Sequence, residues 1–210
     1  MQVIALVGNK GGAGKTTLAI NLASAFNELA PTVLLDADPQ GSSLQWFNIA
    51  GDECVLDVAD ASIGVEDQVR SAEDVSYCVV DCPPSVHSEQ TRDALRISDL
   101  IIIPVQPSPL DLWASVHIET EVNKARKVNP GLRALLVINQ SEPRTRLSRL
   151  AADALQELSL PAASTAIHRR VAHRNAILQG RSVLQMGSRG AAAADEIRQL
   201  IDELKIYMET

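Results

Sequence analysis

The stretch KGGAGKTT, at Lys10–Thr17, combines glycines, lysines and hydroxyls at a spacing that suits phosphate binding. Glycine reaches backbone angles that other residues avoid, so its peptide N–H groups approach phosphate oxygens closely. The helix expected to begin near Lys15 adds its positive N-terminal end. Lys15 is a charged donor for the β and γ phosphates, and the Thr16 hydroxyl is a ligand for Mg²⁺. We therefore expect a nucleotide-binding loop in which Lys10 has a second, separate role.

Two other glycine patterns do not fit this loop. The Rossmann spacing G-x-G-x-x-G is absent, and Asn9 occupies the position where a strict phosphate loop has a glycine, five residues before Gly14. What remains is KGGxGKTT directly after an apolar run, which is more specific than a lone glycine pattern. The nucleotide-contacting residues expected here are Gly11, Gly12, Ala13, Gly14, Lys15, Thr16 and Thr17.

Four further polar segments follow apolar runs and are candidates to complete the site. They are DADPQGSS from Asp36, DCPPS from Asp81, PVQPSP from Pro104 and the single residue Asn139. The carboxyl ends of parallel strands meet at one edge of a sheet, and ligands bind there near the point at which the strand order reverses. A single aspartate at such an end is a helix cap or a turn residue about as often as it is a functional residue. Several carboxylates beside a glycine loop indicate a functional site.

The elements that position these residues alternate regularly along the chain. Candidate strands are the apolar runs at 3–7, 32–36, 77–81, 100–105, 132–138 and 161–165. Candidate helices lie at 15–29, 88–97, 110–128, 146–158, 170–179 and 190–207. Strands that are apolar throughout and separated by helices indicate a parallel sheet buried on both faces. We expect one α/β domain over residues 1–210, in which a mostly parallel, twisted sheet carries helices on both faces.

The composition favours an aliphatic core in a cytoplasmic chain. Hydrophobic residues make up 46% of the sequence but aromatic residues only 3%, which suits parallel strands and helices. No apolar run approaches the ~18 residues of a membrane span, and the N-terminus shows no leader pattern. The cysteines lack metal-ligand spacing, so we expect inert thiols. They are Cys54, Cys78 and Cys82.

The net charge of −7 hides a division along the chain. Residues 28–121 carry eighteen acids and three arginines, whereas residues 122–194 carry twelve bases and three acids. No acidic residue occurs between Leu158 and Ala194. Such asymmetry indicates contact with nucleic acid or another polyanion. The candidate DNA-binding residues in this acid-free segment are Arg169, Arg170, Arg174, Arg181 and Arg189.

Three motifs together resemble the deviant Walker motifs of the ParA/MinD ATPases. They are KGGAGKTT at 10–17, DADPQG at 36–41 and VVDCPPS at 79–85. The resemblance covers nearly the whole chain, and PVQPSPLDLWA at 104–114 is most similar to the small, ParF-like ParA proteins that segregate plasmids. It implies a deviant P-loop NTPase fold and an enzyme that hydrolyses ATP with Mg²⁺.

The resemblance assigns catalytic roles to the residues that match. Lys10 matches the family's signature lysine, which reaches across a dimer interface to the phosphates held by the other subunit. A cation from each side neutralises the charge that develops on a buried γ-phosphate. Asp38 stands where the family positions the attacking water, in a loop that senses the γ-phosphate. The catalytic residues implied are Lys10, Lys15 and Asp38.

The same resemblance implies a metal site and a base site. Asp81 matches the acidic residue that holds Mg²⁺, usually through water, and Asp36 helps to organise the shell of the ion. With the Thr16 hydroxyl, these two carboxylates make up the expected metal-binding set. Adenine is expected near Asn139 and Pro107, so both are assigned to nucleotide binding.

The function implied is that of an ATP-dependent partition ATPase. Mg-ATP closes two chains into a sandwich dimer that binds duplex DNA without sequence preference. A ParB-like or small centromere-binding adaptor stimulates hydrolysis and release, which segregates plasmid or chromosomal DNA. We therefore expect a cytoplasmic, nucleoid-associated protein. The helix-turn-helix extension of larger ParA proteins is missing, so operator-specific repression is not expected. The acidic segment 197–210 differs from basic MinD-type membrane helices, so no membrane partner is expected.

Three alternatives remain open. A ParA-like ATPase can instead position a protein cargo, such as a microcompartment, a chemosensory cluster or a secretion complex. A dethiobiotin-synthetase-like ligase shares the fold and the phosphate loop, but Lys10 argues against it, as does the lack of a further substrate constellation. A structural ATPase switch without DNA contact would leave the basic segment as a solvated face.

Overall fold

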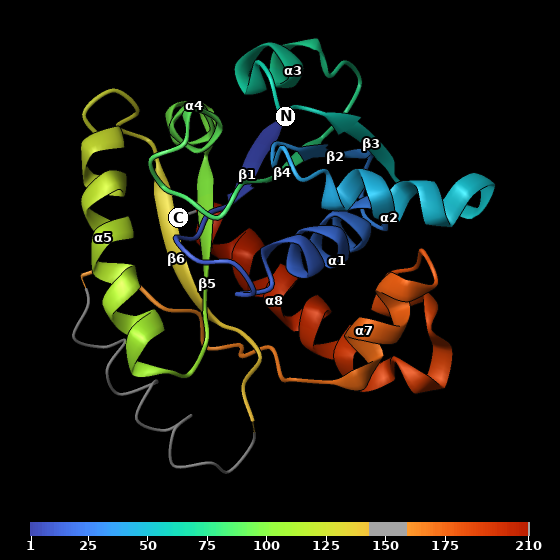
Figure 1. The fold of residues 1–210 in the computed structure, drawn as a ribbon. Coiled ribbons are helices and arrows are strands. Elements are labelled where there is room, and N and C mark those ends of the chain that lie inside the picture. The colour runs from blue at the N-terminus through green and yellow to red at the C-terminus, as the bar shows by residue number, and fades with distance from the viewer. Residues whose placement is uncertain (143–158, 210) are drawn as a thin grey trace.

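The computed structural model describes residues 1–142 and 159–209, with the backbone alone for residues 109–116. Within these ranges, six strands form one sheet in the order β3-β2-β4-β1-β5-β6 (Figure 1). The strands are β1 Gln2–Leu6, β2 Thr32–Asp36, β3 Asp57–Asp60, β4 Tyr77–Asp81, β5 Leu100–Val105 and β6 Arg133–Ile138. Neighbouring strands all pair in parallel. This confirms the parallel sheet that the apolar runs predict.

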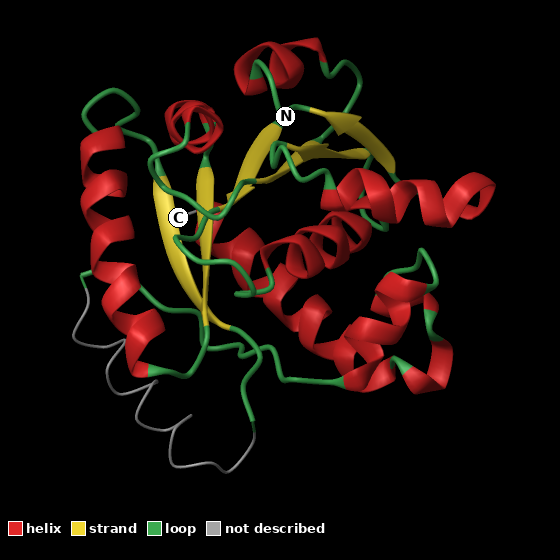
Figure 2. Ribbon diagram, viewed as in Figure 1, coloured by secondary structure: helices red, strands yellow, loops and turns green. Residues whose placement is uncertain are grey.

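Helices cover both faces of the sheet, as Figure 2 shows. The described helices are α1 Lys15–Asn27, α2 Ser42–Ala50, α3 Val65–Ser71, α4 Glu89–Ile97, α5 Pro109–Ala125, α7 Val171–Leu178 and α8 Ala191–Glu209. Helices α1, α2, α7 and α8 share one hydrophobic core with the sheet, while α3, α4 and α5 share the other. The predicted α/β architecture is therefore confirmed.

Strand β1 shows how the sequence builds both cores at once. Side chains alternate between the two faces of a strand. Ile4 and Leu6 accordingly lie in the core with α1, whereas Val3 and Ala5 lie in the core with α4 and α5. Burial of an aliphatic side chain such as Ile4 contributes about 1.5–3 kcal/mol. The strand that leads into the phosphate loop is thus held firmly from both sides.

The strand order reverses beside β1. The chain leaves β1 for β2, which lies beyond β4 on one side, whereas β5 and β6 lie on the other side. Loops that leave the carboxyl ends of these strands therefore diverge and open a crevice. Leu6, Asp36 and Asp81 end neighbouring strands in register. The polar strand-end segments thus meet at one edge of the sheet, as the sequence predicts.

The sequence prediction was wrong at one strand and incomplete in the acidic region. Residues 161–165 form no strand, and a single bridge between Leu136 and Ala162 ties them to β6. Strand β3 and helices α2 and α3 were not predicted. Strand β3 is a short edge strand with the sequence DVAD, so it lacks the apolar run of a central strand. The helix predicted at 146–158 lies outside the described residues.

Helix α8 is the longest helix that the structure describes, and its two sides differ. Ile197, Leu200 and Leu204 are buried in the core with α1, while Asp195 and Asp202 are exposed. None of the described helices is long and apolar enough to cross a bilayer.

The three cysteines are free thiols. Cys78 and Cys82 are buried within β4 and directly after it. Burial raises the pKa of Cys78 to about 12, which keeps this thiol protonated. The thiol of Cys78 is therefore unreactive, in line with the prediction from spacing.

Candidate nucleotide-binding site

The phosphate loop leaves β1 and turns directly into α1. Two of its glycines, Gly12 at φ 81° and Gly14 at φ 86°, adopt left-handed backbone angles. Gly14 is also the residue that precedes the first turn of α1. The loop thereby brings peptide N–H groups and the positive N-terminal end of a helix to one place, and this arrangement binds phosphate.

Three amide side chains hold the carbonyl groups of this loop. Asn139 Nδ2 donates to the Ala13 oxygen at 2.7 Å, while Gln140 Nε2 and Gln106 Nε2 donate to the Gly12 oxygen at 2.9 and 2.7 Å. The sequence singled out Asn139 but missed both glutamines. Each glutamine belongs to a strand-end segment beside an expected site residue, which is the signal that points to it.

Lys15 is buried at the start of α1, with 7% of its surface exposed. Its Nζ donates a hydrogen bond to the Lys10 carbonyl oxygen at 3.2 Å. Burial lowers the pKa of Lys15, and the carboxylates of Asp81 and Asp38 oppose that shift. A buried ammonium is stabilised by an anionic ligand, and the phosphates of a nucleotide supply one. Lys10 lies exposed on the same loop.

Asp81 is fully buried at the end of β4. Ser43 Oγ donates to its Oδ2 at 3.0 Å, whereas Oδ1 has no hydrogen-bond partner among the residues that the structure describes. Burial raises the pKa of Asp81 to about 7, although hydrogen bonds from the side chains of Thr16 and Ser43 oppose that shift. A buried carboxylate oxygen of this kind is completed by a cation. Thr16 and Asp81 therefore fit a Mg²⁺ ion.

These two residues need further ligands to hold the ion. The described ranges contain no group of three or more His, Cys, Asp or Glu side chains that could hold a metal ion. Mg²⁺ commonly keeps several waters and is bound through one or two protein oxygens together with substrate phosphates. Bound in this way, the ion would neutralise charge on the β and γ phosphates.

Asp36 is buried beside Asp81, and both of its carboxylate oxygens are engaged. Oδ1 accepts a hydrogen bond from the Asp38 N–H at 3.2 Å, and Oδ2 accepts one from the Leu44 N–H at 2.9 Å. Burial raises the pKa of Asp36, while these backbone hydrogen bonds oppose the shift. Asp36 thus ties the Asp38 loop to the first turn of α2. Its place in the Mg²⁺ shell stays a prediction.

Asp38 lies partly exposed in the loop between β2 and α2. Its Oδ1 accepts from the Gln40 N–H at 3.0 Å, and its carbonyl oxygen accepts from the Gly41 N–H at 2.8 Å. The loop is therefore a tight turn. Among the described residues Oδ2 accepts no hydrogen bond, so this oxygen is available to hold a water molecule. The position suits the catalytic role that the sequence predicts.

A cavity of about 580 Å³ lies beside the phosphate loop. Its walls come from the start of α1, from Asn139 and Gln140, and from the segment 167–178. This volume is within the usual range for small-molecule sites. The cavity therefore suits the nucleoside part of a nucleotide, and because Asn139 lines it, the contact of Asn139 with adenine stays a prediction that this geometry allows. Pro107 lies in the loop after β5 and outside the described lining of this cavity, so its contact with adenine stays a prediction.

Three of the five predicted DNA-binding arginines are paired with carboxylates. The pairs are Arg169–Glu142 at 3.4 Å, Arg170–Glu196 at 2.5 Å and Arg181–Glu53 at 3.1 Å. Arg169, Arg170 and Arg174 also line the cavity. The acidic partners come from other segments of the chain, which the local charge count could not reveal. The acid-free segment therefore does not form a continuous strip of free arginines.

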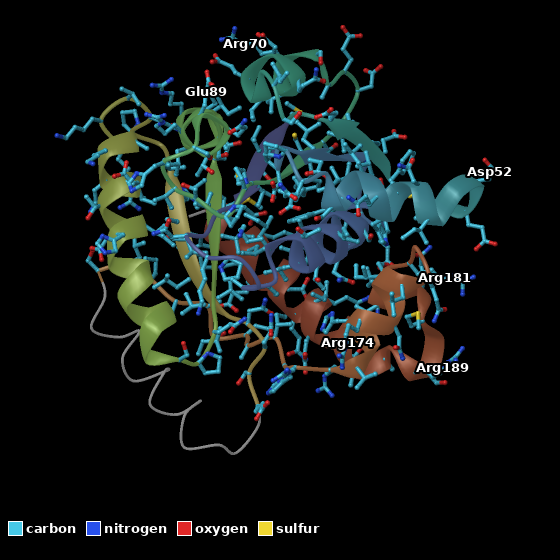
Figure 3. All side chains as sticks on the ribbon, viewed as in Figure 1. Asp52, Arg70, Glu89, Arg174, Arg181 and Arg189 are labelled. Carbon is cyan, nitrogen blue, oxygen red and sulfur yellow. The ribbon has the colours of Figure 1, made fainter. Side chains whose placement is uncertain are left out.

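Three of the five arginines, including the paired Arg181, gather on one lobe of the molecule, formed by α7 and the turns that follow it. Figure 3 shows Arg174, Arg181 and Arg189 on α7 and the turns that follow it, far from Arg70 on α3. Within the described residues, neither Arg174 nor Arg189 forms an ion pair. The binding of DNA to this lobe stays a prediction.

Replacing Gly14 with Ala should destabilise the phosphate loop. An added Cβ would lie 2.5 Å from Asn139 Nδ2, at a φ of 86° that side chains rarely adopt. The displaced amide would release the Ala13 carbonyl group. Gly12→Ala is the matched control, because φ is 81° there but nothing lies within 4 Å. In urea unfolding, we expect Gly14→Ala to cost at least about 1 kcal/mol more than Gly12→Ala. Equal losses would contradict the importance of the Asn139 contact.

Comparison with known proteins extends these observations. Residues 4–184 match the family described as the CobQ/CobB/MinD/ParA nucleotide binding domain. The chain is 39% identical to Maintenance of carboxysome distribution protein A of Halothiobacillus neapolitanus, over 96% of this chain and 95% of the relative. It is 33% identical to the protein of the same name from Gloeobacter kilaueensis, over 97% of this chain and 94% of that one.

A solved structure with a similar fold is the ATP complex of a McdA variant from Cyanothece. It has a TM-score of 0.80 at 17% identity, over 98% of this chain and 96% of that chain. At this identity the likeness concerns the fold alone. The family match, by contrast, covers most of the chain, including the phosphate loop, Asp38 and Asp81. The chain therefore belongs to the CobQ/CobB/MinD/ParA nucleotide-binding domain family and is an ATPase of its ParA/MinD type.

Proposed function

We propose that the chain is a ParA-type ATPase that positions a protein cargo, a microcompartment of the carboxysome kind. The observation that carries this proposal is the match, over almost the full length of both chains, to two proteins named for carboxysome distribution. Segregation of plasmid or chromosomal DNA, the first function that the motifs implied, uses the same ATPase chemistry. The names of these relatives support the cargo-positioning alternative better.

The chemical step rests on the glycine loop and five side chains of the site. The glycine loop and Lys15 bind the β and γ phosphates, and Thr16 and Asp81 hold Mg²⁺ together with them. Asp38 orients the attacking water through its available carboxylate oxygen. Lys10, exposed on the loop, contacts the phosphates of a partner chain, so dimerisation and hydrolysis depend on each other.

Helix α2 connects this site to the lobe with the exposed arginines. At its first turn, Ser43 donates to Asp81 and the Leu44 N–H donates to Asp36. Further along, Trp46 Nε1 donates to the Arg181 carbonyl oxygen at 3.2 Å. A change at the γ-phosphate that moves the carboxylates therefore acts on α2 and, through it, on the lobe. This connection supports a cycle in which ATP controls the binding of DNA and of an adaptor protein.

The cargo is tested by deleting the gene from its source organism. Labelled carboxysome shells and the retention of a marked plasmid are then followed over many generations. The proposal expects the carboxysomes to cluster and segregate unequally while the plasmid is inherited normally. Loss of the plasmid with evenly spaced carboxysomes would contradict it in favour of DNA partition. Reintroduction of the wild-type gene is the control for indirect effects of the deletion.

Charge reversal at Arg181 and Arg189 tests the proposed DNA surface. Both arginines lie outside the lining of the cavity, so nucleotide binding should persist. A dimer would lose four phosphate contacts, which should weaken duplex DNA binding at least about tenfold. The slope of the logarithm of the affinity against the logarithm of the salt concentration should become shallower by about 3–4. Binding is measured by fluorescence anisotropy across a salt series with ATP and Mg²⁺.

Arg70→Glu is the matched control for this surface. Arg70 is an exposed arginine on α3, with 73% of its side chain exposed and an ion pair to Glu66 at 2.5 Å. Figure 3 shows it at the opposite end of the molecule from Arg181 and Arg189. The control should bind DNA as the wild type does. If the variant with both lobe arginines reversed matched this control in affinity and salt slope, the DNA surface would lie elsewhere.

A further inference from the structure

Glu196 of α8 gathers the wall of the cavity around one carboxylate. Its Oε1 lies 2.7 Å from His168 Nδ1 and accepts hydrogen bonds from Arg170 Nε and Nη2 at 3.0 and 2.5 Å. Its Oε2 accepts the His168 backbone N–H at 3.1 Å. The Glu196 side chain is only 11% exposed. One buried side chain from a distant helix thus fixes both residues against α8.

This carboxylate also decides which nitrogen of His168 carries a proton. Burial works against ionisation of Glu196, but hydrogen bonds from Arg170 and His168 outweigh it and hold the pKa of Glu196 below its usual range. An ionised carboxylate only accepts hydrogen bonds, so Nδ1 of His168 is the donor in their contact. In the neutral ring, Nε2 then has a lone pair and acts as an acceptor.

His168 is part of the cavity wall. The residue lines the cavity, 29% of its side chain is exposed, and its Nε2 is not among the buried unpartnered atoms of the described residues. In the described part of the chain, Nε2 has no hydrogen-bond partner. His173 also lines the cavity, but both of its ring nitrogens are buried, out of reach of a ligand. His168 Nε2 is therefore the imidazole nitrogen that a bound base can reach.

The position of His168 is fixed relative to the phosphate loop as well. The Ser141 N–H donates to the Ile167 oxygen at 3.0 Å, and the Arg169 N–H donates to the Ser141 oxygen at 2.8 Å. Asn139, two residues before Ser141, holds the Ala13 carbonyl of the loop. Backbone and side-chain hydrogen bonds thus connect the place where phosphate binds to the place where His168 presents its acceptor.

We propose that His168 reads the base of the bound nucleotide and that Glu196 is the positioning residue that prepares it. An acceptor at this wall selects a purine with an amino group at its 6-position, as in adenine. It disfavours a purine with a carbonyl oxygen there, as in guanine, because two acceptors would meet. His168 is thus a specificity-determining residue for the ATPase. The inference holds for any cargo.

The test compares ADP with purine riboside 5′-diphosphate, which lacks only the 6-amino group. Their affinities are measured by titration calorimetry with Mg²⁺. Neither diphosphate is a substrate for hydrolysis, so the measurement reports binding alone. In the wild type, we expect the amino group to strengthen binding about threefold to tenfold. In His168→Phe, which keeps a ring but has no acceptor, the ratio of the two affinities should fall to about one.

The ratio separates a lost contact from general damage, because a distorted cavity weakens both ligands alike. A wild-type ratio in His168→Phe would overturn the proposal, and so would a ratio near one in the wild type itself. His168→Ala repeats the measurement for the case in which the phenylalanine is not accommodated. Either variant must lose the preference for the amino group if His168 reads the base.

Glu196 has a matched control on the same helix. Glu203 accepts the backbone N–H groups of Ser164 and Thr165 at 2.6 and 3.0 Å, and neither residue lines the cavity. Glu196→Ala should lower the ratio of the affinity for ADP to the affinity for purine riboside 5′-diphosphate, as His168→Phe does. Glu203→Ala should keep the wild-type ratio. A wild-type ratio in Glu196→Ala would overturn its positioning role, as would an equal loss of the ratio in both variants. Thermal unfolding records any stability loss separately.

Discussion

A Lys15→Ala chain is expected to lose nucleotide affinity by on the order of 10²- to 10⁴-fold, because two charge-assisted contacts to phosphate disappear. Lys15 is buried at the start of α1, so no other cation of the loop can replace it without a rearrangement. The loss should be larger for ATP than for ADP, since ADP has the β-phosphate contact but no γ-phosphate. Titration calorimetry with Mg²⁺ measures it.

Lys10→Ala is the matched variant on the same loop and should behave differently. Lys10 is exposed, so a single chain should bind nucleotide almost as the wild type does. The ATP-dependent dimer should fail, and hydrolysis should fail with it. Analytical ultracentrifugation with ATP and with ADP follows the dimer. An equal loss of nucleotide binding in the two variants would contradict the proposal that Lys10 contacts the phosphates bound by the partner chain.

Asp38→Ala should slow ATP hydrolysis by on the order of 10²- to 10⁴-fold, the usual contribution of a residue that handles the attacking water and its proton. ATP and Mg²⁺ binding should change little, because water positioning matters mainly in the transition state. A closed dimer should therefore accumulate with ATP. Single-turnover kinetics measure the chemical step, and size-exclusion chromatography detects the dimer.

Asp60→Ala is a close structural control for this substitution. Asp60 ends the neighbouring strand β3 and accepts the N–H of the residue two positions on, Ser62, at 2.8 Å. Asp38 makes the equivalent contact with Gln40 at 3.0 Å. Because Asp60 lies at the edge of the sheet, its removal should leave hydrolysis unchanged. Normal turnover in Asp38→Ala would contradict the catalytic assignment.

The central sheet and the phosphate loop were readable from the sequence because their signals are local. Buried parallel strands need unbroken apolar runs, and Val79 with its neighbours in β4 supplies one. Gly12 and Gly14 indicate a turn with left-handed backbone angles before a helix. Strand β3 was not predicted because an edge strand needs no such apolar run. Its two ends, Asp57 and Asp60, are exposed.

The parts of the site that the sequence missed depend on contacts over long separations. Glu196 lies 28 residues from His168, and Gln140 lies 128 residues from Gly12. No local pattern distinguishes such a residue from any other polar side chain on a helix or in a loop. The charge count failed at Arg181 for the same reason, since its partner Glu53 lies 128 residues away.

The three amides that hold the carbonyls of Gly12 and Ala13 have a consequence for the speed of nucleotide exchange. A loop that is already ordered loses its conformational entropy when the chain folds, and not when the ligand arrives. Capture of a nucleotide then needs no slow rearrangement of this loop, and its rate approaches that of simple encounter. Differences in affinity among nucleotides will therefore be expressed mainly in how long each one stays bound.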